Sequence, residues 1–290
     1  MIGVSPAYFV SLFGSSFAAA DVIASLPDIS RMGYQSIQLE AYCPETIRIW
    51  ATSGFHQVAS AAARHDLWIS QCVGHALLNG FTDEETLFSD WGIEEAKIMV
   101  EGISSLPCPV FTLPLPPFSF PKGPRTDGER LARINRRFVE KLTRIVDVVS
   151  ARSKVFALEV LPGSLVGGLN GFLELAEKIE SIVGTKICCN FDTGHAHADN
   201  EALPLVISRL GSRIVGTHIC DNWGTENLSL RPGSAGIPWK ELISAMASIE
   251  YAGSYDVEIA CAAPDVHAEY SSAISFLSNF FHHKNRINRT

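Results

Sequence analysis

The stretch TKICCNFDTGHAHADN, residues 185–200, decides the class of fold. Its first half is almost entirely apolar, which is typical of a parallel strand buried on both faces rather than of a strand with one wet face. Its second half places Asp192, His195 and His197 within six positions directly behind that strand. The polar half is therefore either a metal or catalytic cluster at the mouth of a strand, or a polar loop after a core strand.

Runs of the same kind recur along the whole chain. Eight strands are predicted, over residues 1–5, 34–41, 67–74, 109–115, 154–160, 186–192, 213–219 and 254–260. Segments with helical spacing of apolar residues alternate with them, over residues 18–33, 44–66, 82–106, 127–153, 168–184, 200–212, 238–253 and 265–283. Eight strand-helix units in 290 residues predict a (β/α)8 TIM barrel that forms one domain over residues 1–290.

A doubly wound open sheet is the main alternative to the barrel. It would be favoured by a glycine-rich GxGxxG turn after the first strand, but GVSPAYFVSLFGSS, residues 3–16, contains none. The proline-rich stretch 111–128 follows the fourth strand and is predicted to be a stiff loop over one end of the barrel.

The net charge and the cysteine content indicate which binding partners and which cellular compartment to expect for the protein. The formal charge of −8 disfavours nucleic acid and anionic lipid, and the basic stretch 128–144 reads as one solvated helix face. No apolar run reaches the length of a membrane span, and no Lys or Arg precedes Arg31, as a signal peptide would need. The seven cysteines include no CxxC pair and read as free thiols, so we expect a cytoplasmic protein.

Four side chains near the ends of consecutive strands form the candidate site. They are Glu159, Asp192, His218 and Glu258. Any one acid at a strand end would more often be a helix N-cap or an ion-pair partner. Glu159 and Glu258, however, lie in apolar strand sequence, where an unpaired charge is rare. Because the carboxyl ends of barrel strands converge on one face, the four side chains predict one metal site, with an oxygen-rich ligand set that suits Mn²⁺ or Mg²⁺.

Several motifs carry a resemblance to a known family. ALEVLPG (157–163), NFDTGHAHAD (190–199), THICDNWG (217–224) with LRPGSAGIPW (230–239), and YDVEIA (255–260) resemble the sugar isomerase and epimerase superfamily with the xylose isomerase-like TIM barrel. That superfamily includes ketose 3-epimerases, hydroxypyruvate isomerases, inosose dehydratases and endonuclease IV. The resemblance follows the order of elements along the whole chain.

The resemblance implies a role for each member of the site. Glu159, Asp192, His218 and Glu258 would bind one divalent metal, usually Mn²⁺, with Mg²⁺, Co²⁺ or Zn²⁺ as alternatives. Glu159 and Glu258 would also be the catalytic acid and base on opposite faces of the substrate, and His195 would contact substrate oxygens or an additional metal.

Four further polar residues receive weaker assignments. His75, at the end of the third strand, is expected to bind substrate. Glu40 is interpreted as an orienter of other groups. Asp221 would either fix His218 or cap the turn that follows. His197 would be structural or support a ligand.

The chemistry expected is metal-dependent isomerisation or epimerisation of a small carbohydrate or keto acid. A proton would be transferred at the carbon next to a carbonyl, through a metal-stabilised enediolate. A dehydratase of a polyol or cyclitol derivative is the alternative, and a non-catalytic binder of a sugar acid is a further one. An endonuclease IV-like hydrolase loses support because Asn227 and Ser229 replace its Asp and His metal ligands. The last helix and the apolar barrel exterior would support a homodimer.

Overall fold

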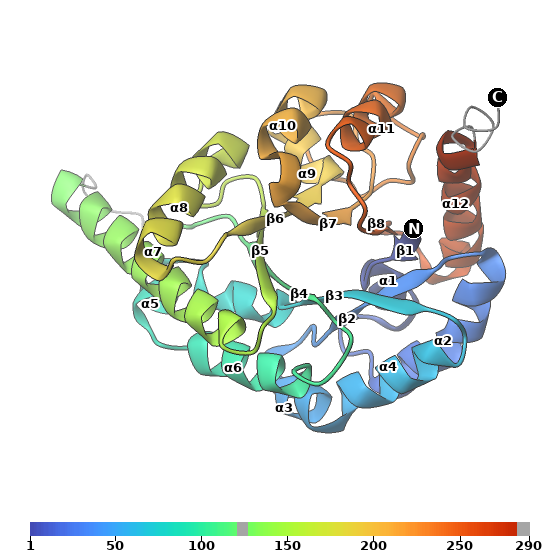
Figure 1. Ribbon diagram of the computed structural model, residues 1–290, viewed down its shortest axis with the longest axis horizontal. Coiled ribbons are helices and arrows are strands. Elements are labelled where there is room, and N and C mark those ends of the chain that lie inside the picture. Colours follow the sequence, from blue (N-terminus) through green and yellow to red (C-terminus); the bar gives the residue numbers. More distant parts are fainter. Residues whose placement is uncertain (121–126, 283–290) are drawn as a thin grey trace.

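The computed structural model describes residues 1–120 and 127–282 and contains one eight-stranded parallel sheet (Figure 1). The strand order is β7-β6-β5-β4-β3-β2-β1-β8. The strands are β1 (Ile2–Val4), β2 (Ser36–Glu40), β3 (Trp68–Val73), β4 (Val110–Leu115), β5 (Val155–Val160), β6 (Cys188–Asp192), β7 (Ile214–His218) and β8 (Tyr255–Val257). All eight strand predictions are confirmed.

The sheet curls until β7 and β8, the strands at the two ends of this order, meet. The Ile219 N–H donates a hydrogen bond to the Asp256 carbonyl at 2.8 Å, and the Glu258 N–H donates to the Ile219 carbonyl at 3.0 Å. These bonds join the ends of β7 and β8, and the barrel is nearly closed. The (β/α)8 prediction is therefore confirmed, and the doubly wound open sheet is excluded.

Helices surround the barrel as an outer ring (Figure 1). They are α1 (Ala7–Phe13), α2 (Ala19–Met32), α3 (Ile47–Ile49), α4 (Phe55–Ala63), α5 (Glu84–Phe88), α6 (Ile93–Gly102), α7 (Gly128–Ser150), α8 (Gly168–Val183), α9 (Thr193–Ala198), α10 (Leu203–Leu210), α11 (Trp239–Ser248) and α12 (Val266–His282). Each predicted helical segment contains at least one of them, whereas α1 and α9 were not predicted. Residues 121–126 of the proline-rich loop and His283 lie outside the described residues.

Alternation along the strands divides the side chains into two sets. In β2, Ile37 and Leu39 are buried in the hydrophobic core, whereas Ser36, Gln38 and Glu40 lie on the other face. That face is the interior of the barrel, since Ser36 and Gln38 hydrogen-bond there to residues of β7 and β8. The interior face of β2 is therefore polar, and alternation along the strand places Gln38 and Glu40 inside the barrel.

The basic stretch 128–144 forms most of α7, and its charged residues differ in exposure. Arg144 is partly exposed and lies 2.6 Å from Asp90 in an ion pair, as expected of a solvated helix face. Lys141 is fully buried instead, and its Nζ donates to the carbonyls of Gly80 at 2.8 Å and Thr86 at 2.9 Å. Burial lowers the pKa of Lys141 to about 8. Lys141 thus ties α7 to the segment before α6.

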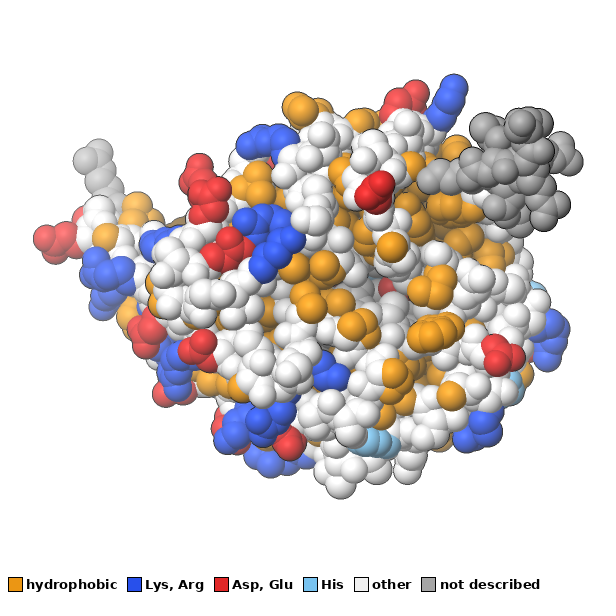
Figure 2. All heavy atoms as spheres, in the orientation of Figure 1, with side chains coloured by type: hydrophobic (Ala, Val, Ile, Leu, Met, Phe, Trp, Pro, Cys, Tyr) orange, Lys and Arg blue, Asp and Glu red, His pale blue; other side chains and the backbone are white. Residues whose placement is uncertain are grey.

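Figure 2 shows one face of the molecule, on which hydrophobic side chains gather around the middle while charged side chains lie mainly near the edge. Within the described ranges, no helix combines the length and apolar character needed to cross a membrane.

Candidate metal centre

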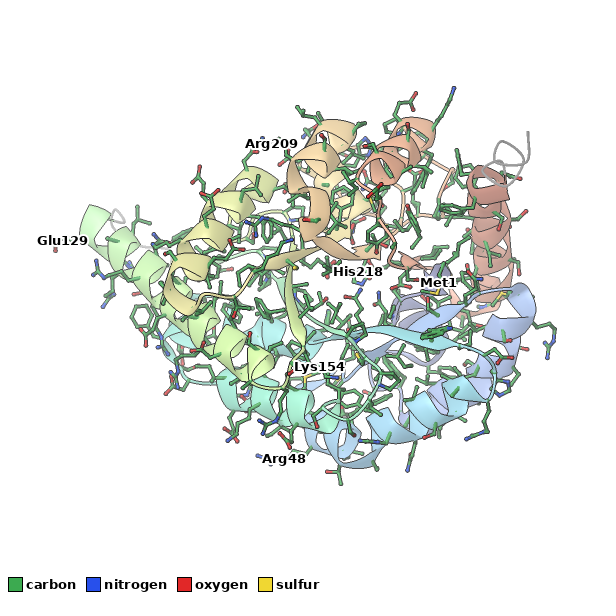
Figure 3. All side chains as sticks on the ribbon, in the orientation of Figure 1. Met1, Arg48, Glu129, Lys154, Arg209 and His218 are labelled. Carbon is green, nitrogen blue, oxygen red and sulfur yellow. The ribbon has the colours of Figure 1, made fainter. Side chains whose placement is uncertain are left out.

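A cavity of about 290 Å³ lies at the C-terminal end of the barrel. Figure 3 labels His218 near the centre of the barrel, among the strands. The polar residues that line the cavity include Glu40, His75, Glu159, His195, His218 and Glu258. Of the residues predicted to bind metal or substrate, the structure therefore places all but Asp192 around one cavity, and Asp192 lies directly beside it.

Each of the four predicted metal ligands lies at or beside the end of its strand. Glu159 is the second-last residue of β5, Asp192 ends β6 and His218 ends β7. Glu258 follows β8 by one residue, so the expectation that it lies inside the strand is wrong. Asp192 is also the N-cap of α9, and its Oδ1 accepts from the His195 N–H at 2.8 Å.

The four side chains point at one another. His218 Nδ1 lies 2.8 Å from Glu159 Oε1, 3.2 Å from Glu258 Oε2 and 3.9 Å from Asp192 Oδ2. One potential ligand atom from each of the four lies within 4.8 Å of the other three. Three carboxylates and one imidazole thus surround a single point.

The residues present fit a divalent cation. Asp192 Oδ2 is buried and has no hydrogen-bond partner among the described residues, although buried polar atoms are rarely left unpaired. This oxygen belongs to the cluster, where a cation would satisfy it and offset the repulsion of three carboxylates. Oxygen ligands with one imidazole suit Mn²⁺, Mg²⁺ or a catalytic Zn²⁺ better than a structural zinc site built from thiolates.

The charges of the cluster shift the pKa values of its members. Burial by itself would lower the pKa of His218, but the carboxylates of Glu159, Glu258 and Asp192 raise it well above its usual range. Burial raises the pKa of Glu258 well above its usual range, and the charges of Asp192 and Glu159 add to this. Burial opposes ionisation of Asp192, yet His195 and His218 hold its pKa low. Protons therefore compete with a metal at His218 and Glu258.

The two predicted substrate-binding histidines both line the cavity. His195 Nε2 is 3.6 Å from both Glu159 Oε1 and Asp192 Oδ2, and its Nδ1 is 3.1 Å from Asn227 Nδ2. His75 follows β3 and stacks on Tyr42 with ring centroids 3.9 Å apart. Burial lowers the pKa of His75, so its ring is neutral at pH 7.

Glu40 is a buried carboxyl that borders the cavity. Burial raises its pKa well above its usual range. Within residues 1–120 and 127–282, no hydrogen bond reaches the Glu40 carboxylate, so the orienting role expected from the sequence has no partner. The carboxyl group is available to a molecule in the cavity.

Of the two roles predicted for Asp221, the structure shows the cap of the following turn and not the contact with His218. Its carboxylate does not contact His218; it accepts hydrogen bonds from the backbone N–H groups of Asn222, Gly233, Ala235 and Ile237 and from the Trp239 indole. The prediction that Asp221 caps the following turn is confirmed, and the prediction that it fixes His218 is wrong. His197 lies outside the cluster, with Nδ1 2.9 Å from Asn222 Oδ1, which fits a structural role.

Sequence reasoning missed the actual partner of His218. His218 Nε2 lies 3.0 Å from Oε1 of Gln38, which is buried in β2. Alternation could have found it, because Gln38 precedes Glu40 by two positions and must share its face of the strand.

The parallel eight-stranded barrel is a TIM barrel, and the carboxylate and histidine cluster at its C-terminal end is a set of residues that could hold a metal ion. The chain belongs to the xylose isomerase-like TIM barrel family, whose family model matches residues 26–280.

Solved structures with a similar fold include sugar epimerases. They include 3-keto-D-glucoside 4-epimerase from E. coli, at 16% identity and a TM-score of 0.72 over 96% of this chain and 98% of that one. D-psicose 3-epimerase with D-tagatose from Clostridium cellulolyticum H10 has 15% identity and a TM-score of 0.72 over 94% and 96%. The IOLI protein with a bound zinc atom has 16% identity and a TM-score of 0.72 over 96% and 97%. At these identities the likeness shows the fold.

Proposed function

We propose that this protein is a divalent-metal-dependent sugar isomerase or epimerase that transfers a proton at the carbon next to a carbonyl. The observation that carries the proposal is the convergence of four ligand-type side chains on one point, with the unpartnered Asp192 Oδ2 among them. The family supports it, as do the names of the sugar epimerases that share the fold.

The metal would be held by Glu159, Asp192, His218 and Glu258. When bound, a divalent cation supplies Lewis-acid stabilisation of negative charge on adjacent substrate oxygens. Mn²⁺ is the metal we propose, because oxygen ligands dominate the set and one imidazole accompanies them.

Glu159 and Glu258 are the proposed acid and base. They come from β5 and from the end of β8, with β6 and β7 between them, so their carboxyl groups approach the cavity from different directions. One would remove the proton and the other would return one. Return to the same carbon from the opposite face gives epimerisation, and return to the neighbouring carbon gives isomerisation.

The remaining polar residues of the cavity suit a small hydroxylated substrate. His75 is neutral, so it can both donate and accept a hydrogen bond, as sugar hydroxyl groups require. His195 and the carboxyl of Glu40 border the same cavity. The cavity of about 290 Å³ is of the size expected for a small ligand.

The direct test is incubation of the metal-loaded protein with a panel of ketoses and keto acids in D2O, followed by NMR. We expect deuterium at the carbon next to the carbonyl of at least one compound. We also expect Glu258→Gln to lower the exchange rate by about 100-fold or more while metal analysis shows the ion retained. Glu174→Gln, on the exposed face of α8, is the matched control and should exchange at the normal rate.

Two outcomes would contradict the proposal. The first is a protein that binds the metal but incorporates no deuterium into any ligand that it binds. The second is a dehydrated product, which would assign the site to a lyase.

A further inference from the structure

A chain of buried hydrogen bonds runs from the candidate metal centre along the inside of the barrel. His218 Nε2 lies 3.0 Å from Gln38 Oε1, and Gln38 Nε2 donates to Asp256 Oδ2 at 2.8 Å. Asp256 is fully buried and also accepts from the hydroxyls of Ser70 at 2.8 Å and Ser254 at 2.6 Å. Gln38 and His218 are 2% and 3% exposed, so water does not replace these partners.

The hydrogen bonds from Asp256 through Gln38 to His218 can have only one assignment of donors and acceptors. A carboxylate only accepts hydrogen bonds, so the amide nitrogen of Gln38 faces Asp256 and its carbonyl oxygen faces His218. That oxygen also only accepts, which makes Nε2 of His218 the donor. The other ring nitrogen, Nδ1, is thereby directed toward Glu159 and Glu258.

We infer that Gln38 and Asp256 are positioning residues that hold the His218 ring with Nδ1 directed at the metal. The inference rests on the proposed metal site and names how one of its ligands is oriented. Partners that hold the second nitrogen of a ligating histidine fix both its tautomer and its ring orientation. Here the final acceptor, Asp256, lies on β8, two residues before Glu258, so one short segment of the chain carries both a ligand and the group that orients another ligand.

The barrel contains a matched control. Gln71 on β3 is equally buried, and its amide nitrogen donates to Asn190 Oδ1 at 2.9 Å. Its carbonyl oxygen accepts from the hydroxyl of Thr112. The same substitution can therefore be made in two buried glutamines, of which Gln38 alone bonds to His218.

The test compares Gln38→Met with Gln71→Met by calorimetric titration of each metal-free protein with Mn²⁺. Methionine keeps the approximate length of the side chain and removes both polar ends. We expect Gln38→Met to weaken Mn²⁺ binding by about 10- to 100-fold, the usual effect of losing such a partner. Gln71→Met should bind Mn²⁺ as the wild type does. Equal affinities for folded Gln38→Met and Gln71→Met would overturn the inference.

A second variant covers the case in which Gln38→Met does not fold. The double substitution Gln38→Glu with Asp256→Asn exchanges the amide and the carboxylate and keeps an acceptor facing Nε2. We expect it to bind Mn²⁺ nearly as well as the wild type, and affinity as poor as that expected for Gln38→Met would contradict the inference.

An NMR measurement on the imidazole ring of His218 tests this inference separately from the proposed function. In ¹⁵N-labelled wild-type protein without metal, the Nε2–H of His218 should give a slowly exchanging NMR cross peak that His218→Asn lacks. Absence of that peak would refute the hydrogen-bonded chain. A wild type that has the peak but binds no metal would refute the proposed function instead.

Discussion

Nδ1 of His218 lies 2.8 Å from Oε1 of Glu159, although the two residues are 59 positions apart and β6 separates their strands. Both side chains are 4% exposed. An imidazole and a carboxylate at this distance form either a buried ion pair or two ligands of one cation. The unpartnered oxygen of Asp192 favours the second interpretation, because an ion pair alone would leave it unsatisfied.

Asp192→Asn tests the ligand with the unpartnered oxygen. The His195 N–H donates to Oδ1, so in Asp192→Asn the amide oxygen is selected at that position and the amide nitrogen takes the place of Oδ2. A nitrogen there cannot ligate a cation, and we expect Mn²⁺ affinity to fall by more than about 100-fold, beyond the effect of losing a supporting partner. Isothermal titration calorimetry measures this. Asp199→Asn, exposed at the end of α9, is the control and should leave the affinity unchanged. Unaltered binding by Asp192→Asn would remove this residue from the site.

The stability of the metal-free protein should fall as the pH rises. The folded-state pKa values of His218 and Glu258 are raised from 6.5 and 4.5. A group whose pKa is raised on folding stabilises the protein fully below its unfolded-state pKa, and this stability is lost as the pH rises through the folded-state pKa. Asp192 has a lowered pKa and acts in the opposite sense, but only in strongly acidic solution.

A bound metal should reverse that trend, because it takes the place of the competing protons. At a free Mn²⁺ concentration of 100 times its Kd, the free energy of unfolding should rise by about 2.7 kcal/mol. We expect the metal-induced increase in Tm, measured at fixed metal concentration, to grow between about pH 6 and pH 8. An increase that shrinks with pH would contradict the assignment of His218 and Glu258 as ligands.

His75→Phe separates the ring stack on Tyr42 from the hydrogen bonds of the imidazole. Phenylalanine keeps an aromatic ring 3.9 Å from Tyr42 but has no ring nitrogen. Loss of one hydrogen bond to substrate should raise KM by about 2- to 12-fold, with metal affinity preserved. Steady-state kinetics on the substrate found by deuterium exchange measures this. An unchanged KM would place His75 outside the substrate site.

Asp221→Asn should destabilise the fold. The carboxylate accepts from four backbone N–H groups and the Trp239 indole, and an amide would place its own N–H groups against some of these donors. We expect the free energy of unfolding to fall by about 3 kcal/mol or more, measured by urea denaturation. A loss of free energy of unfolding below about 1 kcal/mol would show that the loop after β7 does not depend on the hydrogen bonds to the Asp221 carboxylate.

The barrel could be predicted because its signal is repeated eight times. Several strands are apolar nearly throughout, the rhythm of strand and helix supports the others, and errors at one boundary do not change the count. The short helices α1 and α9 escaped prediction, since seven and six residues give too few turns for a periodic pattern. At α9 the polar residues are used otherwise: Asp192 is the N-cap before the helix and His195 lines the cavity, so they do not follow a helical pattern.

The site residues that could be predicted are those that lie at the ends of strands. Glu159, Asp192, His218 and Glu258 each terminate or adjoin a strand, and convergence of strand ends follows from the fold. Alternation with Glu40 places Gln38 inside the barrel, but strand ends do not reveal that it meets His218, because Gln38 lies within its strand and 180 positions away. Asp221 was nearer in sequence, and proximity alone suggested the wrong partner.

The most direct test of the central claim is anomalous X-ray diffraction from crystals of this protein soaked in manganese. We predict one strong anomalous peak within coordination distance of Glu159, Asp192, His218 and Glu258 together. A manganese peak elsewhere, or none at this point while the four side chains diverge, would contradict the claim that they form one metal site.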